Sequence, residues 1–303
     1  MLSANFGVGN RSKMQNHCAY RSMMPIWYRA LFCRQRYSVS IDQKGKSMKK
    51  ALLVVSFGST YQSAVEESIV PVEETLKHTF PDRSFFRAFG SRMIRGTLLR
   101  RDGVTIPGVS EAMDILLREG YGDVLIQPTY FIPGTEYTEL LETVQQYAPR
   151  FGKLAVGKPL LNTMEDFREV IVGLERTFSL SEGEALVLMG HGTVHFANAA
   201  YPALEHIIQT TTPNRIFVGT VEGYPEIDDV IKKLRQANIQ KVMLTAFMLV
   251  AGDHARNDMA GDDEDSWKSR LTREGFQVSC VVKGFGSYDF IRGIFADHAL
   301  SAQ

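Results

Sequence analysis

The sequence predicts an α/β protein of two similar lobes, each a parallel four-stranded sheet flanked by helices, with an active site in the cleft between them. Two observations predict this fold class. Short apolar runs alternate with helical patterns, which is typical of parallel sheets. The order of these segments in the first half of the chain then recurs in the second half. A chain of 303 residues, 44% of them hydrophobic, is long enough for two lobes.

The first half contains four predicted strands, at residues 51–55, 84–89, 124–132 and 153–156. Each is a short run rich in apolar residues and bounded by turn residues. Between them, helical patterns end near His78 and Tyr147, and residues 109–118 form an amphipathic helix that Gly120 stops. This succession predicts strand–helix–strand units with a parallel sheet.

The second half repeats the first. Residues 185–189, 215–221 and 242–250 match the first three strands, and the third match has an offset of 118 that places Glu136 opposite His254. The first half thus offers Phe57, Gly90 and Glu136 at the strand ends where the second half offers His191, Glu222 and His254. We expect an N-terminal lobe at 48–165 and a C-terminal lobe at 166–303, with a terminal helix crossing back to the first lobe.

Residues 1–47 form a different kind of segment. They carry eight basic side chains against Asp42 alone, a net charge of +7, whereas the remainder carries −7. The short apolar patch at 24–32 contains Arg29 and does not fit a secretory signal. We interpret the segment as a disordered tail or as upstream sequence added by a start-site choice, in preference to an organelle transit peptide. Its deletion should leave folding and activity intact.

The rest of the composition limits the function classes. No run approaches the 18 or more apolar residues of a membrane span, and we expect no nucleic-acid or membrane partner. Cys280 is the one cysteine outside residues 1–47. No disulfide framework is therefore expected in the rest of the chain, and a cytoplasmic location fits. The sequence leaves the oligomeric state open and allows a homo-oligomer.

Three potential metal ligands follow the strands of the second half, namely His191, Glu222 and His254. In open α/β sheets, ligands bind beyond the carboxyl ends of the strands. Two imidazoles and a carboxylate suit a divalent first-row ion such as cobalt, nickel, iron or zinc. No thiolate joins them, which argues against a structural zinc site.

Other residues carry weaker signals. His195 lies four residues after His191, but we interpret it as a neighbour of the site; His206 is expected on a helix, and His17, His78 and His298 carry no local signal. Phe57, Tyr130 and Tyr137 are either cleft walls or packing residues. Four arginines could receive substrate carboxylates or form an exposed helix face: Arg92, Arg95, Arg100 and Arg101.

Four motifs resemble the anaerobic sirohydrochlorin cobaltochelatases of the CbiK type, from Met48 to near the C-terminus. They are Leu-Leu-Val-Val-Ser-Phe-Gly-Ser at 52–59, Met-Gly-His-Gly at 189–192, Val-Glu-Gly-Tyr-Pro-Glu at 221–226 and Met-Leu-Val-Ala-Gly-Asp-His-Ala-Arg-Asn-Asp-Met at 248–259. The last motif is long and specific.

The resemblance implies a lyase-class chelatase of cobalamin biosynthesis that inserts Co²⁺ into sirohydrochlorin and needs no other cofactor. It implies that His191 is a metal-binding general base, that Glu222 and His254 complete the ligand set, and that Glu136 is an acidic catalytic partner from the opposite lobe. His191, His254 and Glu136 are then the catalytic residues. Alternatives are an iron or nickel chelatase on the same tetrapyrrole, or a carrier that binds tetrapyrrole or metal without turnover.

Overall fold

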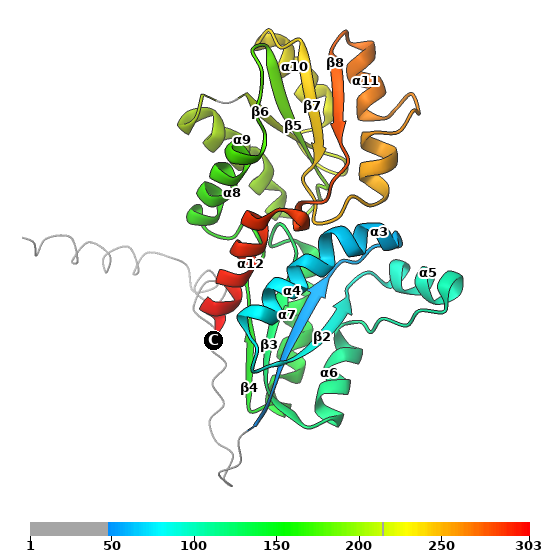
Figure 1. Ribbon diagram of the computed structural model, residues 1–303, viewed down its shortest axis with the longest axis vertical. Helices are drawn as coiled ribbons and strands as arrows, with labels where there is room; N and C mark the ends of the chain where they lie inside the picture. The colour runs from blue at the N-terminus through cyan, green and yellow to red at the C-terminus, as the bar shows by residue number, and fades with distance from the viewer. Residues whose placement is uncertain (1–47, 214) are drawn as a thin grey trace, which may run out of the picture. The chain divides into compact units, whose positions relative to one another are not determined.

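The computed structural model describes residues 48–213 and 215–303, which contain two parallel four-stranded sheets (Figure 1). The predictions for residues 1–47 lie outside the described residues. The first sheet has the order β2-β1-β3-β4 and the second has the order β6-β5-β7-β8, so the two lobes share one topology. All pairings within both sheets are parallel, which confirms the predicted fold class.

The first lobe follows the predicted order of elements. Its strands are β1 (Lys49–Ser56), β2 (Ser84–Phe89), β3 (Tyr121–Pro128) and β4 (Lys153–Val156). Its helical segments are α3 (Gln62–Ala64), the π-helical η2 (Val65–Ile69), α4 (Val70–Thr79), α5 (Arg92–Asp102), α6 (Val109–Arg118), α7 (Thr135–Tyr147) and η3 (Ala148–Arg150).

The second lobe begins after α8 (Met164–Thr177), which leads from one sheet to the other. Its strands are β5 (Glu184–Gly190), β6 (Ile216–Thr220), β7 (Lys241–Ala246) and β8 (Gln277–Val281). Its helical segments are η4 (Phe196–Ala199), α9 (Ala200–Thr211), α10 (Ile227–Gln236), the π-helical η5 (Ala255–Met259), α11 (Trp267–Arg273), η6 (Phe285–Ser287) and the last helix, α12 (Asp289–Ala302).

Both faces of the central strands are buried, which explains why their sequences are continuous apolar runs. In β1, Leu53 and Val55 pack with residues of α6 and α7, whereas Leu52 and Val54 share a core with α4 and α12. That second core continues into the other lobe through Leu186 and Leu188 of β5. Helix α12 contacts α4, α8, β3 and β4, so the C-terminal helix packs against the first lobe (Figure 1).

Two strands end four residues earlier than predicted. β3 ends at Pro128 and β7 ends at Ala246, although the apolar runs continue to Ile132 and Val250. The chain leaves the second sheet where Met248 N–H bonds the Ala246 carbonyl, and the rings of Phe131 and Phe247 then meet at 4.8 Å. These continuations are apolar because they are buried in the core shared by the two lobes. Periodicity alone does not separate this burial from burial in a strand.

Backbone hydrogen bonds correct one match within the repeat. Gly90 N–H bonds the Ser56 carbonyl and Ser91 N–H bonds that of Phe57, while in the second lobe Val221 N–H bonds Gly190 and Glu222 N–H bonds His191. Phe57 is therefore equivalent to His191 as predicted, but the equivalent of Glu222 is Ser91 and not Gly90. Short apolar strands match almost equally well one residue apart, so the sequence alone missed this register.

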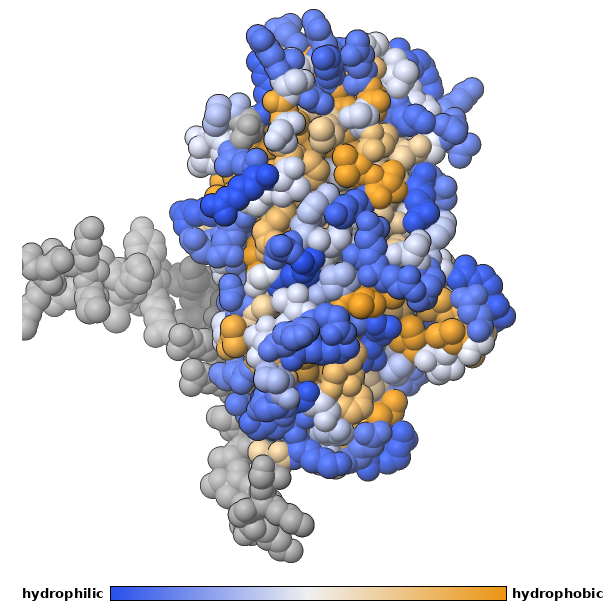
Figure 2. Space-filling view, viewed as in Figure 1, coloured by the Kyte–Doolittle hydropathy of each residue, from blue (hydrophilic) through white to orange (hydrophobic). Residues whose placement is uncertain are grey.

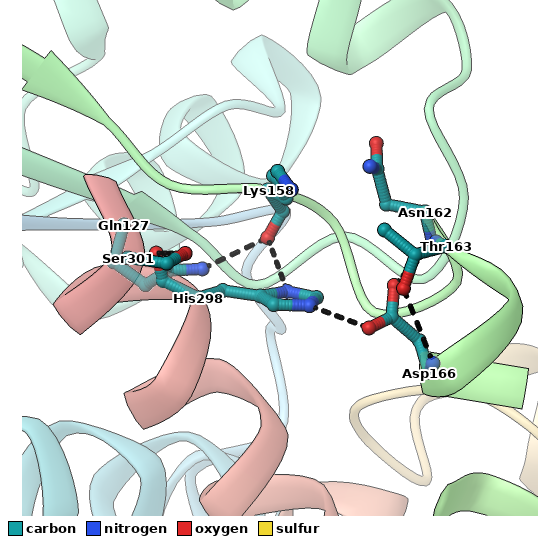
Figure 3. A network of polar contacts seen from close by, with 7 residues as sticks. All are labelled: Gln127, Lys158, Asn162, Thr163, Asp166, His298 and Ser301. Atoms are coloured by element: carbon teal, nitrogen blue, oxygen red, sulfur yellow. Dashed lines mark hydrogen bonds and ion pairs between the residues drawn. The ribbon is translucent and has the colours of Figure 1, made fainter. Parts of the chain in front are cut away.

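A buried polar network joins the C-terminal helix to the chain that connects the two sheets (Figure 3). His298 Nε2 lies 2.9 Å from Asp166 Oδ1, and its Nδ1 lies 3.2 Å from the Lys158 carbonyl, which also accepts a bond from Gln127. Both ring nitrogens of His298 thus face acceptors, an arrangement that the protonated imidazole satisfies with two donated bonds. No local pattern indicated this role for His298.

The Asp166 carboxylate is also a helix cap. Its Oδ2 accepts the N–H groups of Asn162 and Thr163, and the Thr163 hydroxyl accepts that of Asp166, which together form a capping box at the start of α8. Burial of Asp166 opposes its charge, but the His298 ring and the Thr163 contacts outweigh this and lower the pKa of the carboxyl.

No helix in the part of the chain that the structure describes combines the length and apolarity needed to cross a bilayer.

Candidate metal centre

Three predicted ligands converge at the carboxyl edge of the second sheet. His191 follows β5, Glu222 follows β6, and His254 lies eight residues after β7, at the start of η5. One ligand atom from each lies within 4.8 Å of the other two. Two ligands of one tetrahedral ion bonded at 2.0–2.2 Å are about 3.3–3.6 Å apart. Small side-chain rotations would therefore bring all three residues onto one ion.

Main-chain contacts fix the His191 loop. Glu222 N–H bonds the His191 carbonyl at 2.7 Å, which ties the two ligand-bearing loops together. His191 Nδ1 lies 2.9 Å from the carbonyl oxygen of Gly192. A neutral His191 that donates from Nδ1 to this carbonyl keeps a lone pair on Nε2, the atom that would bind an ion or accept a proton.

His254 is oriented by a carboxylate four residues along the chain. Its Nδ1 lies 2.5 Å from Asp258 Oδ2, and the two side chains share the turn formed by η5. A carboxylate on Nδ1 fixes the ring orientation and the tautomer that leaves Nε2 free for a metal. The rings of His254 and His191 are nearly perpendicular, with centroids 4.8 Å apart.

Glu136 lies in the first turn of α7 and is exposed. It does not belong to the metal-competent trio, which is the one such group among residues 48–213 and 215–303. Burial raises the pKa of Tyr201 to about 12; amide groups of Gly192 and His191 oppose this shift and the charge of Glu136 adds to it. The Glu136 carboxylate therefore acts electrostatically on Tyr201, which lies against the His191 loop.

Of the residues with weaker sequence signals, only Phe57 lies near the metal-competent trio. His195 caps η4 by accepting the Ala197 N–H and is not in the trio, and His206 is exposed on α9. Tyr130 and Tyr137 pack against the core of the first lobe, where burial raises both pKa values. Phe57 differs, since its side chain is 41% exposed and its ring centroid lies 6.5 Å from that of His191.

The four arginines considered as carboxylate receptors lie on α5, whose surface shows hydrophilic residues next to hydrophobic ones (Figure 2). Arg95 pairs with Glu111, Arg101 pairs with Asp102, and Arg100 bonds the Thr97 hydroxyl. Arg92 is exposed and has no partner among the described residues. Of the four arginines, Arg92 and Arg100 thus have no carboxylate partner among the described residues, so their guanidinium groups are free to receive one.

A groove of about 630 Å³ between α8 and α12 lies apart from the candidate metal ligands. It is lined mostly by charged and small residues, among them Glu169, Arg176 and Asp297. None of its lining residues is a histidine, and none belongs to the metal-competent trio.

One residue of the centre was missed from the sequence. Asp258 lies in the motif at residues 248–259, but the sequence analysis predicts no role for it. Its spacing of four residues from His254 was the available signal, because residues at i and i+4 on a helical turn face each other.

Two lobes of parallel strands, with two imidazoles and a carboxylate gathered at the strand ends of the second lobe, are an arrangement expected of a metal-binding protein. The structure is similar to that of SirB from Bacillus subtilis with Fe³⁺, with a TM-score of 0.58 over 84% of this chain and 96% of that chain. The sequences are only 15% identical, so this likeness concerns the fold.

Sequence comparisons identify the family. A family model for cobalt chelatase (CbiK) matches residues 50–303, and the chain therefore belongs to the CbiK family of cobalt chelatases. It is 44% identical over 253 residues to a sirohydrochlorin cobaltochelatase of Salmonella typhimurium, covering 83% of this chain and 95% of that protein. It is also 32% identical to the sirohydrochlorin cobaltochelatase CbiKC of Nitratidesulfovibrio vulgaris, over 84% of this chain and 90% of that protein.

Proposed function

We propose that this chelatase inserts Co²⁺ into sirohydrochlorin with release of two protons, as a step of cobalamin biosynthesis, and that the trio His191, Glu222 and His254 presents the ion. The observation that carries the proposal is the convergence of these three ligand atoms within 4.8 Å at the edge of the second sheet. Membership of the cobalt chelatase family and the names of the two relatives support the metal and the tetrapyrrole.

The chemistry requires a base and a ligand set that releases its metal. Each insertion removes two pyrrole protons, and imidazole accepts protons near neutral pH. His191 can take this role once the ion has left it, because Nδ1 faces the Gly192 carbonyl and the lone pair of Nε2 is then free to accept a proton. Glu136 provides a second carboxylate, on the first lobe, that can take up the other proton.

The trio holds Co²⁺ without enclosing it. Three protein ligands leave coordination positions open for the ring nitrogens, and two imidazoles with one carboxylate bind cobalt less durably than several thiolates do. The His191 and Glu222 side chains are 39% and 59% exposed, so both can move as the ion passes to the macrocycle. A site that binds the bent, partly metallated ring better than the free ring would accelerate the transfer.

The ligand set does not by itself select the metal, because cobalt, iron and nickel all accept imidazole and carboxylate. Cobalt is favoured by the family, and iron or nickel insertion is the alternative within the same chemistry. We place the reaction in the cytoplasm because Cys280 is the one cysteine outside residues 1–47, so no disulfide framework is expected there.

The test is steady-state absorbance of the purified full chain with sirohydrochlorin and Co²⁺, Fe²⁺ or Ni²⁺ in turn, following loss of the metal-free spectrum. We expect many turnovers per protein with Co²⁺ above the uncatalysed rate. Faster turnover with iron or nickel would reassign the metal. A spectral change limited to one equivalent would instead identify a carrier.

A further inference from the structure

Three large apolar side chains are exposed on the two loops that carry His191 and Glu222. Val194 and Phe196 follow His191 and are 102% and 81% exposed, and Tyr224 follows Glu222 and is 61% exposed. Single exposed apolar residues are common on protein surfaces. Three on adjacent loops beside a metal-competent cluster are more informative, because exposed apolar groups that gather at one place mark binding sites.

Hydrogen bonds hold the two loops together. Asn198 accepts the Thr193 N–H at 3.1 Å through its side-chain oxygen and donates to the Tyr224 carbonyl at 2.6 Å. The loops also meet at Gly192, where φ is +83° and a Cβ atom would lie 2.7 Å from the Gly223 nitrogen. Only glycine fits this approach. The apolar side chains are therefore displayed on a backbone that is already fixed.

Phe57 adds an apolar surface from the first lobe, facing the same cluster. Its ring lies 6.5 Å from that of His191, and its carbonyl accepts the Ser91 N–H at 3.2 Å. The next residue, Gly58, has φ of +100°, and a Cβ there would lie 2.6 Å from the Phe89 ring, so the turn after Phe57 favours glycine. Apolar groups from both lobes thus accompany the proposed metal ligands.

We propose that Phe57, Val194, Phe196 and Tyr224 form a macrocycle seat, which binds the apolar ring system of the tetrapyrrole substrate. This inference rests on the proposed function and names the residues that recognise the larger substrate. A tetrapyrrole presents a broad conjugated face with carboxylates at its rim, so the seat contacts the face and the carboxylates remain at the hydrated edge. The metal ligands and the seat share the same two loops, which places the ring next to the ion.

Asn198 is then a positioning residue, since it touches neither substrate but sets the distance between the loop of Val194 and Phe196 and the loop of Tyr224. Asn198→Asp keeps the acceptor for Thr193 N–H but loses the donor to the Tyr224 carbonyl. We expect it to raise the KM for sirohydrochlorin with little change in the KM for Co²⁺. Loss of a merely structural bond would lower the unfolding midpoint without separating the two KM values.

The seat is tested directly with Phe196→Ser and Phe57→Ala in the full chain. Val172→Ser on α8 and Leu300→Ser on α12 are matched controls, because both residues are exposed and lie outside the metal centre and the seat. The measurements are the KM for each substrate and the Kd for metal-free sirohydrochlorin from quenching of its fluorescence. Removing one aromatic side chain that the bound sirohydrochlorin would bury should raise the KM and Kd for sirohydrochlorin roughly tenfold or more, with the KM for Co²⁺ unchanged.

The outcomes separate this inference from the proposed function. Wild-type turnover with unchanged sirohydrochlorin affinity in both seat variants would overturn the seat and leave the chelatase in place. Tight sirohydrochlorin binding that the variants weaken, without turnover by the wild type, would support the seat and reject catalysis. If the variants instead change only the sedimentation coefficient, the surface is a contact between copies of the chain and the seat is wrong.

Discussion

The two lobes use one strand order for different chemistry. At the end of its first strand the first lobe has Phe57 where the second lobe has His191, and after its second strand it has Ser91 where the second lobe has Glu222. Ser91 is occupied as the cap of α5, where its hydroxyl accepts the Ile94 N–H. Identical scaffolds therefore carry a metal-competent trio on one side and an aromatic ring with a helix cap on the other.

This difference separates what the fold provides from what the side chains decide. The repeated sheet supplies equivalent positions at its carboxyl edge, and the residue types at those positions determine whether an ion binds. A symmetric pair of metal sites would hold the ion from both sides. One ligand-bearing lobe opposite an apolar one leaves a face open to the ring that must receive the metal.

The largest effect is expected from removing the base. His191→Ala should lower cobalt insertion about 10²–10⁴-fold, because a general base and a metal ligand are lost together. The rate of loss of the metal-free sirohydrochlorin spectrum measures this, with circular dichroism to show that the variant is folded. His206→Ala on α9 is the control and should keep full activity. Near-normal turnover by His191→Ala would reject the assignment.

A smaller effect is expected when the second imidazole loses its orientation. Asp258→Asn should weaken Co²⁺ binding roughly 10–100-fold, because the carboxylate that fixes the His254 tautomer is gone. Competition with a chromophoric chelator measures the affinity. Asp262→Asn removes the same charge from an exposed position paired with Lys268 and should not change it. Equal affinities in the two variants would show that Asp258 does not orient the ligand.

Placing a metal ligand on the first lobe, as on the second, should slow the release of Co²⁺ to the ring. Phe57→His places a third imidazole opposite His191, and we expect tighter Co²⁺ binding with roughly tenfold slower transfer to the ring, since ground-state binding of the ion raises the barrier to its departure. Single-turnover kinetics of the Co²⁺-loaded variant measure the transfer, with Phe57→Leu as the apolar control. Unchanged Co²⁺ affinity in Phe57→His would mean that the two lobes do not face the same ion.

The smallest effect on catalysis is expected at the buried network of α12. Asp166→Asn should leave the turnover of folded protein nearly unchanged but lower the free energy of unfolding by about 1–3 kcal/mol, because the charged partner of His298 is lost. The folded state lowers the Asp166 pKa from 3.8, so its contribution is present at neutral pH and is lost as the pH falls below about 4.

Denaturant unfolding at pH 7 and pH 3 measures this difference, and Glu165→Gln is the matched control because Glu165 is exposed and pairs with Arg168 on the surface of α8. The gap between wild type and Asp166→Asn should shrink at pH 3. A gap that stays constant between the two pH values would show that the carboxylate charge of Asp166 does not contribute.

Much of the fold could be predicted because its strands are short apolar runs in a repeated order. β2 and β4 have the predicted bounds. The offset of 118 that pairs Glu136 with His254 is also supported, because Thr129 N–H bonds the Val55 carbonyl in the first lobe and Phe247 N–H bonds the Met189 carbonyl in the second. The ends of β3 and β7 were wrong because burial between the lobes continues the apolar pattern past the last ladder bond.

The trio could be predicted because its members follow three consecutive strands of one sheet. The Asp258 contact and the His298 network could not be predicted with the same ease. The first depends on the rotation of a π-helical turn, and the second joins residues 132 positions apart. The His298 contacts are decided by tertiary packing, which no local pattern encodes.

We propose that the second lobe alone holds the ion, through two imidazoles and one carboxylate. X-ray absorption at the cobalt edge of the Co²⁺-loaded full chain tests this proposal. We expect a shell with two imidazole ligands, reduced to one in either His191→Ala or His254→Ala and retained in Phe57→Ala. A shell that keeps both imidazoles in the two histidine variants would show that the ion binds elsewhere.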